Sequence, residues 1–223
     1  RVDANLIEVV VKYNLNNIDS SNKLTYSINS KGVLNVKNEF IYGGKLNDAQ
    51  MPRFGMNFIM PKEYNNVIWY GRGPHENYSD RKSSAFVGLY NNLVEDLDFE
   101  YSRPQENGYR TDVRWLKVLN KNNIGFEIIG EPLVSFSAHY NTIEDFDDGL
   151  SPKKPGENVG ARKRIVKKQR KPIDVPKRDF ISLNIDLKQM GVGGDNSWGA
   201  RTLKKYTIEP GNYTFSYVIK PIN

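Results

Sequence analysis

A glycine-rich stretch with a single tryptophan is the feature of this sequence best suited to binding chemistry. It runs from Gly191 to Gly199, with three glycines ahead of Asp195 and Trp198. Glycine accepts positive φ angles that other residues resist, so the stretch is typical of a loop that presents one large ring. The flat face and indole N–H of that ring suit a protein interface or a sugar. The alternative is a tight turn with Trp198 folded back onto a core.

Phosphate binding is the other common use of glycine-rich loops. Residues 191–197 fit neither G-x-x-x-x-G-K-[ST] nor a G-x-G-x-x-G that opens a helix. The sequence therefore argues against a nucleotide site here.

Two further stretches have the composition of reactive loops. Residues 71–82 combine glycines, an imidazole, acids and an Asn-Tyr pair, and residues 103–112 contain Glu106, Asn107, Gly108 and Arg110. Polar residues of mixed charge on a turn are typical of binding loops carried by a rigid scaffold.

The titratable residues give weaker signals. His75 and His139 are the only histidines and cysteine is absent, so a metal site has little support, although Asp186 or Asp195 could touch an ion. A loop hydrogen bond for His75 and a half-exposed strand position for His139 are the structural alternatives. The paired acids of the chain are sequence neighbours in polar stretches, which is typical of solvated loops: Glu95-Asp96, Glu144-Asp145 and Asp147-Asp148.

The net charge of +6 belongs to one segment of the 223-residue chain. Residues 151–178 hold eleven Lys or Arg against two acids, with four prolines and no aromatic residue. Surfaces that bind single-stranded nucleic acid usually interleave basic residues with stacking aromatics, so the segment predicts a solvated basic loop insertion and no nucleic-acid partner. No apolar run approaches the roughly 20 residues that cross a bilayer, so we also expect no membrane association.

Alternation of apolar and polar residues governs most of the chain. About ten short segments follow this period of two and are separated by turn signals, which favours an all-β protein built as a large antiparallel β-sandwich over residues 1–223. Helical periodicity is scarce, and only 83–90 could form a turn or two of helix. Trp69 and Trp115 lie in strand-like runs and are expected in the core.

Three long motifs, in order, carry a resemblance to a known family. They are residues 69–82 (WYGRGPHENYSDRK), 106–108 (ENG) and 183–198 (LNIDLKQMGVGGDNSW). The sequence resembles the C-terminal domain, also called the small-chain domain, of the family 2 glycoside hydrolase β-galactosidases of the lactose-operon type. The resemblance covers most of the chain and implies a large β-sandwich, or supersandwich, of the galactose-mutarotase-like type.

The resemblance also implies roles for individual residues. In that family the tryptophan of the Gly-Gly-Asp-x-Ser-Trp motif stacks on sugar in an active site built mainly by a barrel domain. That role falls on Trp198, with Asp195 in the same motif. The mobile flap of the family maps onto Glu106, Asn107, Gly108 and Arg110, although this chain has Gln105 where family members often have serine.

The resemblance places catalysis outside this chain. Retaining glycosidases need two carboxyls about 5 Å apart, and in the family both glutamates lie on the barrel. We therefore expect no catalytic residue here, an isolated chain that does not hydrolyse lactose, and an excised part of a longer, oligomeric enzyme that cleaves terminal β-galactosides. No cofactor is expected within the chain, since the Mg²⁺ and Na⁺ or K⁺ sites of the family lie mostly elsewhere.

Three alternatives stay open at this point. A carbohydrate-binding module could hold sugar by itself through its tryptophans. A mutarotase-like aldose epimerase would use His75 or His139 with a carboxyl for ring opening. A scaffold that only supports oligomer assembly would not need Trp198.

Overall fold

The computed structural model describes residues 2–3, 5–44, 50–146, 171–194, 196 and 200–223. This part of the chain is all-β and antiparallel, with short 3-10 turns and no α-helix. The strands are β1 (Val2–Asp3), β2 (Leu6–Leu15), β3 (Ser20–Asn29), β4 (Leu34–Ile41), β5 (Arg53–Pro61), β6 (Asn66–Gly73), β7 (Phe86–Leu93), β8 (Arg110–Leu119), β9 (Gly125–His139), β10 (Phe180–Gln189) and β11 (Tyr213–Ile222).

The strands form one sheet that branches at β9. The main path runs β1-β2-β3-β4-β11-β9-β8-β6-β7, while β10 pairs with both β9 and β5. The first half of β9 pairs with β11 through the register Ile219↔Ile128. Its second half pairs with β10 through Ile185↔Phe136. Strand β9 thus pairs with β11 and with β10 along the same edge, one after the other. The β10–β5 pair therefore separates from the β4–β11 pair.

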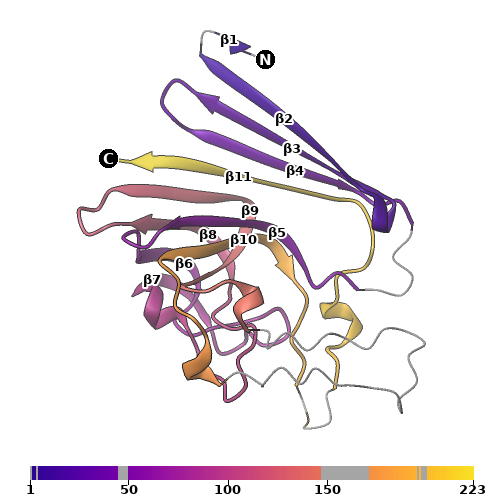
Figure 1. The fold of residues 1–223 in the computed structure, drawn as a ribbon, viewed down its shortest axis with the longest axis vertical. Coiled ribbons are helices and arrows are strands. Elements are labelled where there is room, and N and C mark those ends of the chain that lie inside the picture. The colour runs from indigo at the N-terminus through magenta and orange to yellow at the C-terminus, as the bar shows by residue number, and fades with distance from the viewer. Residues whose placement is uncertain (1, 4, 45–49, 147–170, 195, 197–199) are drawn as a thin grey trace.

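The separated branch packs against β4 and β11 and creates the second layer of a sandwich (Figure 1). Phe54 of β5 meets Phe40 of β4 and Tyr213 of β11, with ring centroids 6.1 and 5.5 Å apart. Phe58 meets Tyr217 edge to face at 6.2 Å. These aromatic pairs bury large apolar surfaces between the layers. The predicted antiparallel β-sandwich is confirmed.

Alternation in β6 and β8 places a second set of apolar side chains under the loops. Trp69 is fully buried, as expected, and packs edge to face on Phe136. Trp115 is only half-buried and lies beside Tyr70, 6.4 Å between ring centroids. The prediction that both tryptophans lie in the core is therefore confirmed for Trp69 and only partly for Trp115.

Two local predictions from the sequence are wrong. Residues 83–90 do not form a helical turn, because Phe86–Leu93 is strand β7, paired along its length with β6. Backbone pairing with a neighbouring strand outweighs a weak local helical tendency. His139 is not half-exposed but 5% exposed, because both faces of the second half of β9 are covered.

The basic insertion predicted for 151–178 lies mostly outside the described residues. Its end, from Lys171, forms a short 3-10 turn, Pro172–Asp174, and then Arg178 pairs with Asp145 at 2.5 Å. Within the described ranges, no helix is long and apolar enough to cross a membrane.

Candidate functional site

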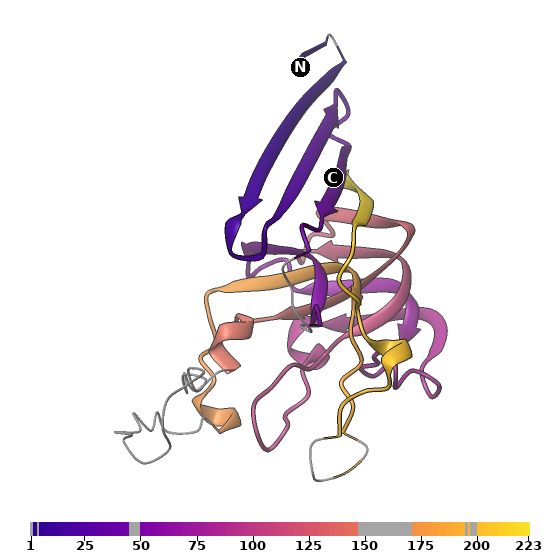
Figure 2. The same ribbon diagram turned by 90° about the vertical axis from the view of Figure 1, so that its right-hand side faces the viewer.

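The three motif stretches come together at the loop end of the sandwich. The loop after β6, the loop before β8 and the loop after β10 all leave their strands in the same direction, toward the lower part of Figure 2. Hydrogen bonds connect these loops across 32 to 122 positions of sequence. Acidic side chains make several of these connections.

Glu76 joins the first motif to the Glu106–Gly108 loop. Its Oε2 accepts a hydrogen bond from the backbone N–H of Gly108 at 2.8 Å. Its Oε1 accepts hydrogen bonds from Arg81 Nη2, at 3.2 Å, and from the hydroxyl of Tyr101. The Glu76 carboxylate is only 12% exposed, so these donors replace the water that it would otherwise bind.

Gly108 is required by this geometry. It adopts φ +71°, and a Cβ at this position would lie 2.8 Å from both Leu97 O and His139 Cε1. A side chain would therefore be strained by its backbone angle and would push the loop away from β9.

Asn77 also joins the first motif to the residues just before and at the start of β8. Its backbone N–H donates to Tyr109 O at 2.7 Å, and its Oδ1 accepts from Thr111 N at 3.0 Å and Thr111 Oγ1 at 2.7 Å. Asn77 is completely buried. It therefore takes the place of a strand partner where β8 begins.

Arg110 and Asn107, both predicted to bind substrate, are buried in the base of their loop. Arg110 is 3% exposed and donates to Leu97 O, Gly108 O and Pro74 O at 2.6 to 3.1 Å. Burial lowers the pKa of Arg110 to about 10. Asn107, 3% exposed, receives Phe99 N at 3.1 Å and donates to Gln105 O at 3.1 Å.

Asp80 holds the base of the glycine-rich loop. Its Oδ2 accepts from Gly193 N and Thr202 Oγ1, both at 2.8 Å, and its Oδ1 from Val192 N at 3.2 Å. Burial alone would raise the pKa of the Asp80 carboxyl, but these donors outweigh it and hold that pKa below its usual range. One carboxylate thus ties together the two ends of the loop.

The glycines of that loop are needed for different physical reasons. A Cβ on Gly191 would lie 2.4 Å from Asp80 Oδ2 and from Thr202 Oγ1, so only glycine leaves room for the carboxylate. Gly193 and Gly194 adopt φ +63° and +86°, which favour glycine. The positive φ angles expected for this glycine-rich stretch are present at these two residues, while Asp195 and Trp198 themselves lie outside the described residues.

Arg53 connects Glu106 to the sandwich. Its Nε lies 2.7 Å from Asp186 Oδ2 of β10, and its Nη2 donates to Gln189 Oε1 at 2.7 Å. The same Nη2 lies 3.4 Å from Glu106 Oε1. Glu106 keeps 27% of its side chain exposed, so it is the predicted flap residue whose carboxylate remains accessible.

His139 closes the far side of the Glu106–Gly108 loop. Its Nε2 lies 3.1 Å from Asn107 O and its Nδ1 lies 2.9 Å from Asp98 Oδ1. Both ring nitrogens are therefore engaged. His75, the other histidine, is exposed and lies 3.1 Å from Ser84 Oγ. His139 contacts the carboxylate of Asp98, but its other nitrogen is occupied by Asn107 O, and His75 contacts a hydroxyl. Neither ring therefore combines a carboxyl neighbour with a free nitrogen, as acid–base chemistry would need.

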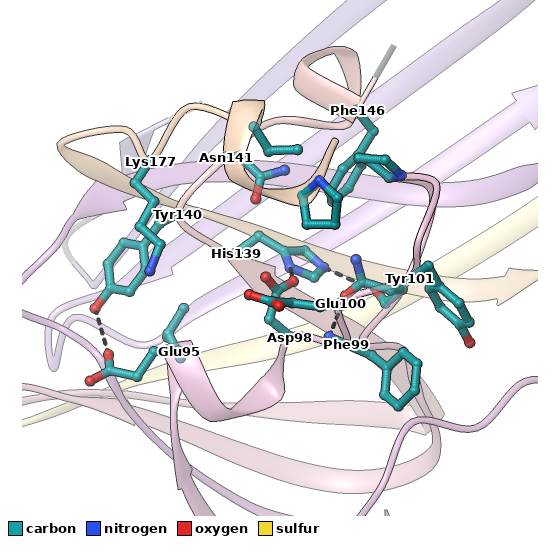
Figure 3. Close-up of a pocket in the computed structure, with 15 residues that line it drawn as sticks. Glu95, Asp98, Phe99, Glu100, Tyr101, His139, Tyr140, Asn141, Phe146 and Lys177 are labelled. Carbon is teal, nitrogen blue, oxygen red and sulfur yellow. Dashed lines mark hydrogen bonds and ion pairs between the residues drawn. The ribbon is translucent and has the colours of Figure 1, made fainter. Parts of the chain in front are cut away.

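A pocket of about 160 Å³ lies behind His139 (Figure 3). Its walls combine carboxylates with aromatic rings, and Asp98 and Glu100 lie close to the imidazole. Tyr140 donates to Glu95 at 3.3 Å at the opposite wall. The pocket thus shares Asn107 and His139 with the loop but not Glu106. The described residues contain no cluster of three His, Cys, Asp or Glu able to hold a metal ion.

Sequence analysis missed the anchoring residues Arg53 and Asp80 and considered Asp186 only as an ion contact. Signals were present for two of them. Asp186 is the one acid in an otherwise apolar alternating strand, and Arg53 precedes the apolar face of β5. A lone charge at the end of an apolar strand indicates a buried partner elsewhere. Nothing in the sequence identifies which partner.

The model of the family described as "Beta galactosidase small chain" matches residues 2–219. The chain belongs to the beta galactosidase small chain family. The predicted small-chain domain is thus confirmed, and the three motif stretches described above lie within the matched range.

Curated relatives agree with this membership. The β-galactosidase of Priestia megaterium (strain DSM 319 / IMG 1521) is 34% identical over 215 residues, which cover 96% of this chain and 19% of that protein. Those of Halalkalibacterium halodurans and Streptococcus thermophilus are 32% and 28% identical, covering 84% and 90% of this chain and 17% and 18% of theirs. The small-chain domain thus spans about a fifth of the length of these relatives.

Among solved structures, a galactose mutarotase related enzyme from Lactobacillus acidophilus matches all of this chain and 70% of its own, with a TM-score of 0.41 and 9% identity. A GalM/aldose epimerase homologue from C. elegans matches all of this chain and 68% of its own, with a TM-score of 0.41 and 10% identity.

Proposed function

We propose that this small-chain domain forms one side of the active site of a longer β-galactosidase, which hydrolyses terminal β-galactosides such as lactose with retention. The observation that carries the proposal is the convergence of three distant motifs at one end of the sandwich, joined by Glu76 and Asp80. Loops that only connected strands would not need partly buried carboxylates to hold them together.

The domain contributes binding surface in this proposal. Trp198 offers an aromatic face for a pyranose ring, and Glu106 offers a carboxylate that accepts hydrogen bonds from sugar hydroxyls. Asn107, Gly108 and Arg110 shape the loop from beneath, as their burial supports. Asp195 shares the loop of Trp198. The nucleophile and the acid/base are supplied by another domain, and the metal ions of the family lie mostly there as well.

Activity of the isolated chain is the first test. We expect no turnover of a chromogenic galactoside by the 223-residue protein, because the two carboxyls of a retaining glycosidase are supplied elsewhere. Turnover that persists after purification from host enzymes, and that is lost in a variant of this chain, would contradict the proposal.

Sugar binding separates the proposal from a self-sufficient carbohydrate-binding module. We expect NMR titration of the chain with galactose, glucose and lactose to show no saturable shift at millimolar sugar, because one wall of a site leaves most hydroxyls unpaired. Saturable binding that Trp198→Ala abolishes would favour the module. The contacts of His75 and His139 give no support to an aldose epimerase.

A further inference from the structure

The Glu106–Gly108 loop is held in two different ways along its length. Gly108 is fixed by Glu76 through its backbone N–H, and Asn107 is fixed by His139 through its backbone carbonyl. Glu106, the residue before them, is reached through its side chain by Arg53. The direction of the Glu106 carboxylate therefore depends on where Arg53 lies.

Arg53 is well placed to set that direction. Its guanidinium lies 5.4 Å over the ring of Tyr109, is 17% exposed, and uses Nη2 for both Gln189 and Glu106. A planar guanidinium with contacts on several edges has few alternative orientations. It can therefore transmit a fixed position from the sandwich to the loop.

Asp186 fixes the other edge of Arg53. It is 1% exposed, and Gly55 on the neighbouring strand leaves the space that its carboxylate occupies, since a Cβ there would lie 1.9 Å from Asp186 Oδ1. The charged and titratable groups that act on Asp186 are Arg53 of β5 and Tyr109 and Glu106 of the loop before β8. Among the described ion pairs, the Asp186 carboxylate pairs with Arg53 alone.

We propose that Arg53 is a positioning residue that aims the Glu106 carboxylate into the sugar site, and that buried Asp186 holds Arg53 in that orientation. The link to sugar rests on the proposed function, whereas the positioning itself does not. Asp186, Arg53 and Glu106 form a relay from strand β10 through strand β5 to the loop surface.

The test is backbone order along the loop, measured by ¹⁵N NMR relaxation on the 223-residue chain. In the wild type we expect an order parameter near 0.85 at Glu106, falling below about 0.6 in Arg53→Gln. Gln105 should keep its order, because Asn107 still donates to its carbonyl. Asn107 and Gly108 should keep their order, because Glu76 and His139 remain. Arg53→Lys should behave like Arg53→Gln, since an ammonium group cannot span both carboxylates.

Matched controls decide whether the effect is specific. Arg178→Gln removes an ion pair with Asp145 in another part of the chain and should leave all four loop amides unchanged. Unchanged order at Glu106 in Arg53→Gln would overturn the inference. An equal loss of order at Asn107 and Gly108 would overturn it too, because it would mean general loosening.

A readout in pH separates positioning from simple packing. Burial raises the pKa of Asp186 to about 7, so its charge, and with it the grip on Arg53, should rise between pH 6 and 8. We expect order at Glu106 to rise over that range in the wild type and to be flat in Asp186→Asn. A wild-type profile identical to that of Asp186→Asn would contradict the role of Asp186.

Kinetics test the link to sugar separately. In the Priestia megaterium β-galactosidase with its matching segment replaced by this chain, Arg53→Gln and Glu106→Gln should each raise KM several-fold with kcat nearly unchanged. The double variant should lose no more than either single one. Lost loop order with an unchanged KM would overturn the sugar role of Glu106 while leaving the positioning intact.

Discussion

Asp186 and Asp80 lie beneath the two loops of the candidate site, and they do so in opposite electrostatic settings. Asp186 is nearly inaccessible, lies against one guanidinium, and has a raised pKa. Asp80 is half-buried, accepts two backbone N–H groups and a hydroxyl, and has a lowered pKa. Burial disfavours the charged form of Asp186, whereas Asp80 is stabilised as an anion by the loop that it anchors.

Two aspartates thus anchor the two loops by different physics. The Glu106–Gly108 loop is fixed at three successive residues and depends on a charged relay. The described contacts of the glycine-rich loop to Asp80 lie at its ends, at Val192, Gly193 and Thr202. Substitutions at the two acids should therefore differ in size, in pH dependence and in the loop they affect.

Removing Asp186 should have the largest effect. Asp186→Ala leaves the Arg53 charge largely buried without its partner, which should lower the free energy of unfolding by about 3 kcal/mol. Asp186→Asn should cost less, because the amide has nearly the same shape and keeps a polar oxygen beside the guanidinium of Arg53. Chemical denaturation at pH 7 measures both values. Equal stability of the alanine variant and the wild type would contradict the buried ion pair.

The pH dependence of this effect has a definite sign. Because the pKa of Asp186 is higher in the folded state than in the unfolded state, the folded protein binds the proton more tightly. Its contribution to stability is complete below about pH 4 and is lost as pH rises toward 7. Relative to Asp186→Asn, the wild type should therefore lose stability between pH 4 and 7, which denaturation across that range would reveal.

Removing Asp80 should cost about 2 kcal/mol. Asp80→Ala leaves two backbone N–H groups and the Thr202 hydroxyl without their acceptor, and hydrogen bonds to a charged group contribute about 1.5 to 3 kcal/mol. The sign in pH is reversed: the stabilisation is present above about pH 4 and is lost as pH falls through the lowered folded-state pKa. If the wild type lost stability relative to Asp80→Ala as the pH rose from 4 to 7, as expected for Asp186, the contrast between the two acids would be refuted.

Gly191→Ala sharpens the account of Asp80. The new Cβ would displace the carboxylate from its donors and should cost about 1.5 kcal/mol, within the usual range for overpacking. The matched control is Gly194→Ala, where a Cβ meets nothing within 4 Å and only the positive φ opposes it. NMR titration should show the Asp80 pKa moving toward its ordinary value in Gly191→Ala alone. The same movement in both variants would exclude a steric origin.

His139→Ala should have the smallest effect of the series. It removes the contact to Asn107 O and should cost about 1 kcal/mol in chemical denaturation. Amide hydrogen exchange should accelerate at Asn107 and Gly108, while the glycine-rich loop stays as it was. Faster exchange at Val192 and Gly193 instead would mean that the two loops are not held independently.

The sequence predicted the fold and the loops better than it predicted their supports. Alternation defined most strands, because burying one face of a strand is a local property with a period of two. It failed at 83–90 and at His139, where pairing with β6 and coverage by a second layer decide the outcome. The motifs located the loops, and glycine chemistry predicted the positive φ angles found at Gly193 and Gly194. The partners of Asp80, Asp186 and Arg53 are distant in sequence, and composition carries no information about such pairs.

Trp198 gives the most direct test of the central claim, that this domain completes a galactoside site with the rest of a longer enzyme. The measurement is the KM for lactose of the Priestia megaterium chimera with Trp198→Ala, beside Tyr13→Ala, which removes an exposed ring from strand β2. We expect a KM raised about tenfold for Trp198→Ala, equivalent to about 1.4 kcal/mol of stacking, and no change for Tyr13→Ala. An unchanged KM in Trp198→Ala would contradict it and would leave the domain with a scaffolding role.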